Sequence, residues 1–253
     1  MYKAKIDAQT VPAEKNKLQN RKNSFREKSY IFLSRLGIAT FQKIFPDYFA
    51  QEPLSPTDRY IEYPFAIRNL PKPPAKILDV GCAGSPFPLL LAGFGYFVYG
   101  IDLREYAITN RITFDNFQFI KGDITKTAFS DNFFDAVTAI STVEHIGIGG
   151  RYGVSDDLQG DKKALEEIRR ILKPQGILIL TIPFGKAKII KPYCKIYDSI
   201  LIKQLTQNFK LEKEEYCMQD SGNDWHGCLK DEAEKIDAKN DRFALCLLKL
   251  VKK

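Results

Sequence analysis

Three acidic side chains, Asp79, Asp102 and Asp123, stand at or just after the ends of short apolar runs in the middle of the 253-residue chain. Runs of this kind, separated by stretches with helical periodicity, predict parallel strands with helices between them. The carboxyl ends of parallel strands meet at one edge of a sheet, and open α/β sheets bind their ligands in the crevice outside that edge. We therefore expect the three carboxylates to face one ligand.

A glycine bend follows the first of these runs. Residues 77–85 read Ile-Leu-Asp-Val-Gly-Cys-Ala-Gly-Ser, so Gly81 and Gly84 stand between a strand and the next helix. Glycine lets the backbone approach a ligand where a Cβ atom would collide. Asp102, at the tip of the second strand, can accept hydrogen bonds from both hydroxyls of a ribose. Asp123, at the tip of the third, can accept one from an adenine amino group. Together these residues predict a nucleoside site.

A nicotinamide-dependent oxidoreductase is the alternative interpretation of this pattern. In such enzymes the glycine-rich turn lies under a pyrophosphate. A carboxylate at the position of Asp79 would repel the phosphates. This side chain therefore favours a nucleoside ligand that has no phosphate and carries positive charge.

Five short motifs occur in order over residues 75–185: Asp79–Gly84, Gly100-Ile-Asp102, Gly122-Asp123, Phe134-Asp-Ala-Val137 and Ile171–Leu178. The series resembles that of class I S-adenosylmethionine-dependent methyltransferases. The resemblance implies that S-adenosylmethionine is bound by side chains at the strand tips: its methionine part by Asp79 and the turn of Gly81, Cys82, Ala83 and Gly84, its ribose by Asp102 and Leu103, and its adenine by Asp123 and Ile124, with Ser141 also beside it. The family's pattern has glycine in place of Ala83 and again at Ser85, so Ala83 narrows the space beside the ligand.

The loop over residues 141–152 is expected at the same end of the sheet, where an acceptor would bind. Methyl transfer requires a base only when the acceptor loses a proton. His145 is the candidate general base, because its unperturbed pKa lies near neutrality. Glu144 either orients His145 or contacts a ligand, although the two residues can also simply shape the loop. Arg151 and Tyr152 suit an anionic or sugar-like acceptor, with a solvated loop as the alternative.

The elements that must position these residues follow from the hydrophobic pattern. We expect strands over 76–80, 97–101, 117–121, 134–140, 177–182, 209–217 and 243–251, with helices over 88–94 and 161–172, the latter capped by Asp161. The last two strands have no convincing helix between them and should be antiparallel. The prediction is an α/β fold: a Rossmann-like seven-stranded sheet, mostly parallel with an antiparallel last strand, and helices on both faces.

The first third of the chain has a different character. Residues 1–23 are polar and lysine-rich and predict a flexible basic arm. Residues 24–74 predict a helical extension that ends at the proline cluster 71–74, and we expect it to close over the acceptor site. Residues 75–253 then form the methyltransferase domain. Residues 1–50 hold ten Lys or Arg against four Asp or Glu, so six of the seven excess positive charges lie there.

Composition narrows the function classes. Residues are 44% hydrophobic and 27% charged, no apolar run is long enough to span a membrane, and the N-terminus lacks a signal-peptide core. Five scattered cysteines without a C-x-x-C pair favour reduced thiols, a cytoplasmic location and no metal. The loop after residue 140 lacks the motif of DNA adenine methyltransferases, and no cysteine between Cys82 and Cys194 serves a cytosine-C5 enzyme.

These features predict a methyltransferase that acts on an oxygen or nitrogen atom of a small-molecule or glycan-type acceptor. Nucleic acid is possible but not favoured, because the charge excess lies outside the predicted domain. Two alternatives stay open. The first is methylation of RNA or protein with the basic N-terminus as a docking arm, and the second is a non-catalytic module that binds S-adenosylmethionine.

Overall fold

The computed structural model describes residues 57–106, 114–150, 154–220, 224–238 and 244–253, together with six helical positions between residues 29 and 43. The chain divides into two compact units, 1–51 and 52–253, and the fold below is that of the second unit. The predicted basic arm, most of the helical extension before residue 57, and both Arg151 and Tyr152 lie outside the described residues.

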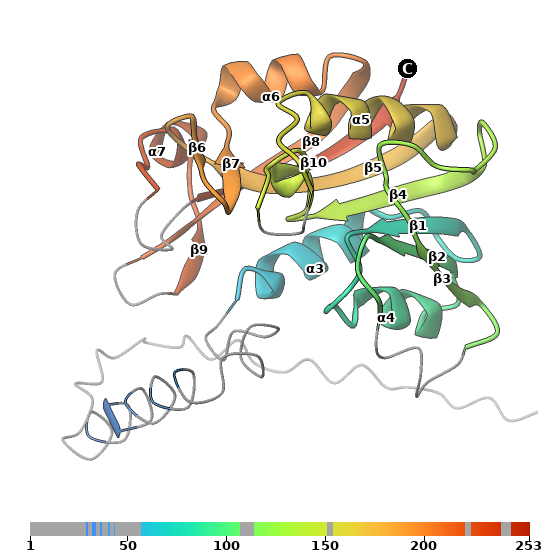
Figure 1. Cartoon of the computed structure of the whole chain (residues 1–253), viewed down its shortest axis with the longest axis horizontal. Coiled ribbons are helices and arrows are strands. Elements are labelled where there is room, and N and C mark those ends of the chain that lie inside the picture. The colour runs from blue at the N-terminus through green and yellow to red at the C-terminus, as the bar shows by residue number, and fades with distance from the viewer. Residues whose placement is uncertain are drawn as a thin grey trace, which may run out of the picture. The chain divides into compact units, whose positions relative to one another are not determined.

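An eight-stranded sheet forms the centre of this unit (Figure 1). Its strands run in the order β3 (Phe117–Lys121), β2 (Phe97–Asp102), β1 (Lys76–Val80), β4 (Phe134–Ile140), β5 (Leu172–Phe184), β10 (Ala244–Lys252), β8 (Phe209–Gln219) and β9 (Trp225–Gly227). The first five are parallel, whereas β10 is antiparallel to both β5 and β8. The predicted antiparallel pair at the end of the chain is therefore confirmed.

The predicted number of seven strands is wrong by one. The eighth strand, β9, has only three residues and pairs antiparallel with the end of β8, with Gln219 opposite Trp225 and Cys217 opposite Gly227. Three residues are too few for an alternating apolar pattern to stand out in a sequence. β8 itself continues two residues past the predicted end at Cys217, which provides the edge to which β9 bonds.

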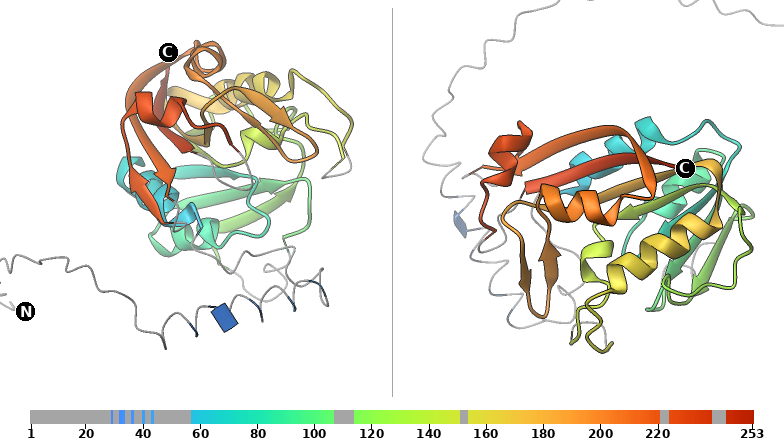
Figure 2. Two further views of the ribbon diagram at one scale, coloured as in Figure 1. Left: turned by 90° about the vertical axis from the view of Figure 1, so that its left-hand side faces the viewer. Right: turned by 90° about the horizontal axis from the view of Figure 1, so that it is seen from above.

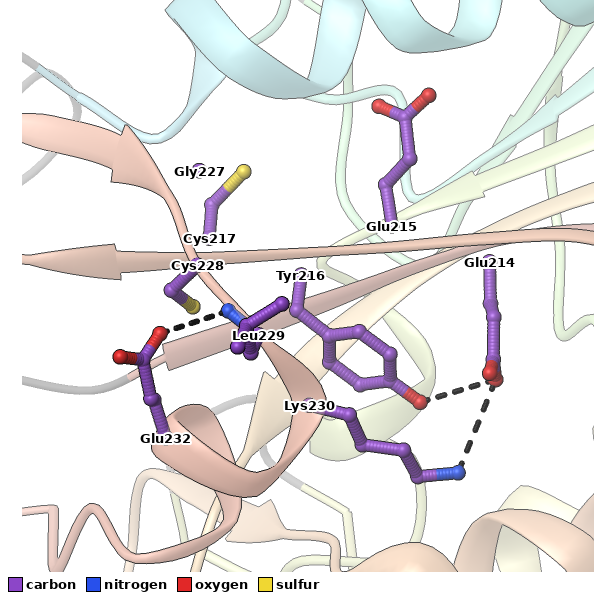
Figure 3. A pocket seen from close by; sticks show the side chains of 9 residues that line it. All are labelled: Glu214, Glu215, Tyr216, Cys217, Gly227, Cys228, Leu229, Lys230 and Glu232. Atoms are coloured by element: carbon purple, nitrogen blue, oxygen red, sulfur yellow. Dashed lines mark hydrogen bonds and ion pairs between the residues drawn. The ribbon is translucent and has the colours of Figure 1, made fainter.

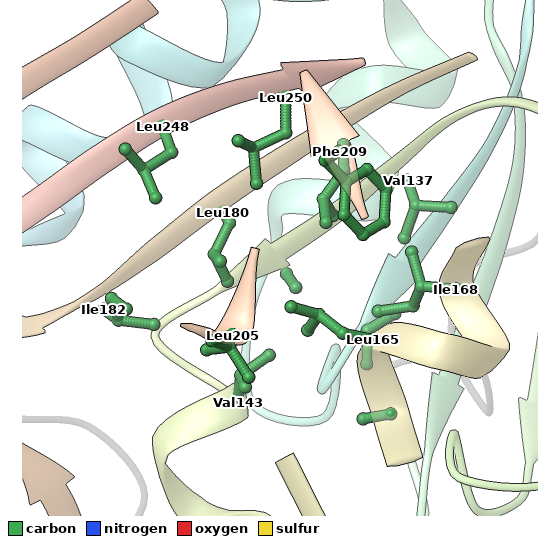
Figure 4. Close-up of a cluster of buried hydrophobic side chains, with 14 of the residues drawn as sticks. Val137, Val143, Leu165, Ile168, Leu180, Ile182, Leu205, Phe209, Leu248 and Leu250 are labelled. Carbon is green, nitrogen blue, oxygen red and sulfur yellow. The ribbon is translucent and has the colours of Figure 1, made fainter. Parts of the chain in front are cut away.

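Helices cover both faces of the sheet, as predicted (Figure 2). α3 (Arg59–Asn69) and α4 (Phe87–Gly93) pack on one face, and α5 (Gly160–Ile171) and α6 (Ser199–Leu205) on the other. Successive strand residues point to opposite faces. In β1, for example, Ile77 joins the cluster under α3 and α4, while Leu78 joins the cluster under α5. Figure 4 shows part of this second cluster, including Leu165 and Ile168 of α5. Burying each such side chain stabilises the fold by about 1.5–3 kcal/mol. The packed strands therefore hold their ends in fixed positions.

Asp161 does not cap α5, so that prediction is wrong. The residue before the helix is Gln159, and Asp161 lies in the first turn with 4% of its surface exposed. Its Oδ2 atom accepts hydrogen bonds from the Tyr197 hydroxyl and the Lys195 ammonium, both at 2.9 Å. Asp161 therefore ties α5 to the hairpin of β6 (Lys188–Ile190) and β7 (Cys194–Ile196), a contact between distant segments that a local capping rule does not include.

Candidate active site

The glycine bend leaves β1 with both glycines in the left-handed region, Gly81 at φ +76° and Gly84 at φ +87°. A Cβ atom on Gly81 would lie 2.4 Å from the Thr142 side chain, whereas one on Gly84 would meet nothing within 4 Å. Close approach of a ligand, the predicted reason for glycine, therefore fits Gly84. Gly81 is required by its backbone angle and by Thr142, which follows β4.

Asp79 is 3% exposed and accepts a 2.6 Å hydrogen bond from the Thr138 hydroxyl at Oδ1. Burial raises the pKa of Asp79 to about 7, although the Thr138 hydrogen bond and the charge of Arg59 lower it, and the charge of Asp102 adds to the increase. Among the described residues, no hydrogen bond reaches the Oδ2 atom of Asp79. That oxygen can accept from an ammonium group, whose positive charge would in turn favour the ionised carboxylate.

Asp102 ends β2 beside the bend and is 8% exposed. Backbone N–H groups anchor both of its oxygens: Ala83 donates to Oδ2 at 2.9 Å and Arg104 to Oδ1 at 2.8 Å. The Arg104 guanidinium also covers the carboxylate, with two longer contacts of 3.2 Å and a 2.7 Å bond to the Ala83 carbonyl. No pattern in the sequence indicated that Arg104 would lie where ribose hydroxyls were predicted.

The remaining predicted donor residues surround this centre. Asp123 follows β3, next to β2 in the sheet, and is exposed, with its Oδ1 atom accepting from the Thr125 N–H at 2.8 Å. Ile124 is buried, and Leu103 is 43% exposed. Cys82 is buried under the bend, and burial raises the pKa of its thiol. The structure thus brings the predicted carboxylates to three neighbouring strand ends.

Helix α3 supplies polar groups that sequence analysis missed. Glu62 is fully buried, and its Oε1 atom accepts hydrogen bonds of 2.5 Å from the hydroxyls of Ser141 and Thr181, while its Oε2 atom pairs with Arg59. Ser141, predicted to lie beside the donor, is held in a left-handed conformation at φ +42°. A carboxylate three positions before the buried Phe65 on one helix face was the available signal. This part of the predicted extension does cover the loop after β4.

Tyr63, one residue further along α3, reaches the glycine bend. Its hydroxyl lies 2.7 Å from the Ser85 hydroxyl, and its ring stacks on Phe87 with centroids 4.5 Å apart. Ser85 also accepts from the Phe87 N–H, which orders the start of α4. α3 therefore connects the bend on one side to the loop after β4 on the other.

Glu144 and His145 lie in the 3₁₀ turn η2 (Val143–His145). Glu144 is 2% exposed, and its Oε1 atom lies 3.7 Å from His145 Nε2. His145 Nδ1 lies 2.6 Å from the Tyr193 carbonyl oxygen. Because a carbonyl only accepts, Nδ1 carries the proton, and Nε2 faces Glu144 as an acceptor in the neutral ring.

A separate hollow of about 690 Å³ lies between β8, β9 and α7 (Lys230–Glu234) (Figure 3). Glu214, one of its lining residues, accepts a 3.0 Å hydrogen bond from Tyr216 and lies 3.8 Å from the Lys230 ammonium. None of its nine lining residues belongs to the predicted site. Across the described ranges, no cluster of His, Cys, Asp and Glu could hold a metal ion, and no helix has the length and apolarity to cross a membrane.

Residues 78–180, from β1 into β5, match the protein family described as a methyltransferase domain. The chain contains a class I S-adenosylmethionine-dependent methyltransferase domain. S-adenosylmethionine is the cofactor of this domain, and the residues present fit it. Asp79 has an oxygen without a partner among the described residues, Gly84 borders open space, and Asp102 is anchored by backbone groups at the next strand end.

Curated relatives of the methyltransferase domain match only part of the chain. A sterol 24-C-methyltransferase of Gibberella zeae is 36% identical over 114 residues, which are 42% of this chain and 27% of the relative. A ubiquinone biosynthesis O-methyltransferase of Haemophilus ducreyi is 31% identical over 116 residues, 42% of this chain and 44% of the relative. The chain thus spans well under half the length of these relatives.

Solved structures match more of the methyltransferase fold at lower identity. A methyltransferase from Methanosarcina mazei has a TM-score of 0.54 at 17% identity, covering 75% of this chain and 97% of that one. The 1,6-didemethyltoxoflavin-N1-methyltransferase of Burkholderia thailandensis, solved with S-adenosylhomocysteine, has a TM-score of 0.54 at 13% identity, covering 89% and 90%. Both likenesses establish the fold.

Proposed function

We propose that this protein transfers the methyl group of S-adenosylmethionine to an oxygen or nitrogen atom of a small-molecule acceptor. The observation that carries the proposal is the buried Asp79, which keeps one oxygen without a hydrogen bond among the described residues and lies beside the open side of the glycine bend. Burial disfavours the ionised form of such a carboxylate, and a nearby cation favours it. The ammonium group of the donor's methionine part supplies that cation.

Different residues of the chain bind different parts of S-adenosylmethionine. Asp79 holds the ammonium group, and Asp102 accepts from the ribose hydroxyls once the two 3.2 Å contacts of Arg104 are exchanged for them. Asp123 and Ile124 lie at the next strand end for the adenine. S-adenosylmethionine, when bound, supplies an electrophilic methyl group on a sulfonium. Alignment of the two reactants and exclusion of water account for much of the rate in such displacements.

The burial of polar groups beside the donor site supports a small-molecule acceptor. Glu62 on α3 and Glu144 in η2 are both buried, and Ser141 donates to Glu62, so the surface of a folded polymer would not reach these groups. The named relatives act, by their names, on sterols and in ubiquinone biosynthesis, both small molecules. Methylation of RNA or protein and donor binding without catalysis are the competing proposals, and a glycan-type acceptor has no observation in its favour beyond the sequence.

Calorimetry with S-adenosylmethionine and S-adenosylhomocysteine tests the donor site. Asp102→Asn keeps an oxygen for the Ala83 N–H but removes the charge, and we expect it to weaken binding of both ligands by about 10–100-fold, the worth of a charge-assisted hydrogen bond. Equal affinity in wild type and variant would contradict the assignment.

Turnover then separates the competing functions. Release of S-adenosylhomocysteine with a small-molecule acceptor supports the proposal. A protein that binds the donor but releases no product with small molecules, RNA or protein substrates would be a binding module. A salt-sensitive RNA affinity that is lost when residues 1–23 are deleted would favour the RNA alternative.

A further inference from the structure

Glu144 is a buried carboxyl group, and one of its oxygens has no hydrogen-bond partner among the described residues. Only 2% of the residue is exposed, and the oxygen concerned is Oε2. Its other oxygen, Oε1, lies 3.7 Å from His145 Nε2, too far for a hydrogen bond. Leaving a carboxyl oxygen buried and unpaired costs folding free energy, so an orphan of this kind calls for a functional explanation.

The charged groups around Glu144 come from three elements. α3 contributes Glu62 and Arg59, Asp58 directly precedes it, η2 contributes His145, and Tyr197 follows β7. Burial raises the pKa of Glu144 well above its ordinary value, and the charge of Glu62 adds to this. Arg59, the arginine in this described group, is paired with both Glu62 and Asp58. Tyr197 donates to Asp161 and so offers Glu144 no hydrogen. In the free protein Glu144 is therefore held protonated up to unusually high pH.

Glu144 also lies close to the donor side of the site. Thr142, two residues earlier, packs against Gly81, and its hydroxyl donates to the Val80 carbonyl at 3.1 Å. The residue that precedes η2 thus contacts the glycine bend. The charge of Arg59 lowers the pKa of both Asp79 and Glu144, so one cation acts on both carboxyl groups. The positive sulfur of a ligand at the bend would likewise favour the ionised form of Glu144.

We propose that Glu144 is the base that takes the proton lost by the acceptor. This inference rests on the proposed function. In the step, the acceptor's O–H or N–H bond breaks and its proton goes to Glu144 Oε2, while the heteroatom's electron pair forms the new bond to carbon. The carbon–sulfur bond electrons stay on sulfur, which leaves as a neutral thioether. The acceptor class is an alcohol, phenol or amine that enters with its proton, because an anion would face Glu62, Asp58 and Glu144.

His145 then has a different role from the one predicted. Nδ1 is fixed by the Tyr193 carbonyl, and Nε2 faces Glu144 from 3.7 Å, while 23% of the side chain is exposed. His145 is therefore placed to receive the proton from Glu144 after each turnover and pass it to solvent. Replacing His145 should slow steady turnover more than the first methyl transfer.

Proton linkage tests this inference without an acceptor. S-adenosylmethionine carries a positive sulfur and S-adenosylhomocysteine does not, so only the first should drive a proton off Glu144. Titrating both ligands by calorimetry, in buffers of different ionisation enthalpy from about pH 5.5 to about pH 8, gives the number of protons released. For wild type we expect S-adenosylmethionine to release roughly 0.5–1 proton more than S-adenosylhomocysteine near neutral pH.

Matched variants assign the proton. Glu144→Gln should abolish the difference while its affinity for S-adenosylhomocysteine stays within about twofold, and His145→Gln should keep the difference. Asp79 faces the ammonium group that both ligands share, so it cannot produce the difference. A difference that persists in Glu144→Gln, or none in wild type, overturns the assignment. If Glu144→Gln does not fold, infrared difference spectra of wild type decide it: a protonated carboxyl band must vanish with S-adenosylmethionine alone. Failure of both ligands to bind would instead refute the proposed function.

Discussion

Gly81→Ala should destabilise the protein through a contact that the structure identifies atom by atom. The new methyl group would lie 2.4 Å from both Cγ2 and Oγ1 of Thr142, and the residue must keep φ near +76°. The left-handed conformation costs an L-residue about 1–2 kcal/mol, and forcing an extra methyl group into packed surroundings costs about 1–3 kcal/mol. We expect the free energy of unfolding to fall by about 2–5 kcal/mol, measured by urea denaturation.

Gly84→Ala is the matched control, because it has nearly the same φ but open space where its Cβ would lie. It should lose only the conformational cost, about 1–2 kcal/mol, and instead weaken donor binding. Thr142→Ala relieves the collision, so the double variant Gly81→Ala/Thr142→Ala should be more stable than the sum of the two single losses predicts. Equal losses for the two glycine variants, or simple additivity in the cycle, would refute the reasoning.

Three further substitutions test the charges and the buried network. Asp79→Asn should bind S-adenosylmethionine more weakly yet be more stable than wild type above neutral pH. Because the pKa of Asp79 is raised from 3.8 to about 7, the free energy of unfolding of wild type falls as pH rises between these values. The variant avoids this loss of about 4 kcal/mol. Urea denaturation at about pH 4 should show no such gain. Arg104→Ala should bind the donor at least as tightly as wild type in calorimetry, because its two 3.2 Å contacts compete with the ribose; weaker binding would assign Arg104 to the donor site. Tyr197→Phe should lower the free energy of unfolding by about 1–3 kcal/mol, since buried Asp161 loses a 2.9 Å hydrogen bond, and a neutral result in thermal unfolding would contradict this.

The inner strands of the central sheet could be predicted because they are buried on both faces. Such strands are nearly continuous runs of apolar residues, and β4 has the predicted bounds, Phe134–Ile140. The less buried edge strand Phe117–Lys121 also has the predicted bounds. The β6–β7 hairpin, α6 and β9 were missed because each is short and is held by distant partners. Asp161, for example, binds Lys195 and Tyr197 from 34 and 36 residues away. Local periodicity contains no information about such contacts.

The candidate site likewise contains residues that could be predicted from the sequence and residues that could not. Asp79 and Asp102 were predicted because strand order alone brings the ends of β1 and β2 together. Glu62 was not, since its partners Ser141 and Thr181 lie 79 and 119 residues further along the chain. Arg104 was missed for another reason: an arginine two residues after a strand usually lies in solvent, and only its bond to the Ala83 carbonyl shows that it covers Asp102.

The balance of buried charge explains why this site should take a cationic donor. Asp79, Asp102, Glu62 and Glu144 are all buried at or beside the strand ends, and two arginines, Arg59 and Arg104, are the cations that pair with them in the described part of the chain. Arg59 pairs with Glu62 and Asp58 and Arg104 pairs with Asp102, so neither arginine forms an ion pair with Asp79 or Glu144. Burial raises the pKa of both carboxyl groups and so favours their protonated forms. A ligand with one positive charge at its methionine end and another at sulfur supplies the two missing cations, and a phosphate-bearing nucleotide would add to the excess of negative charge.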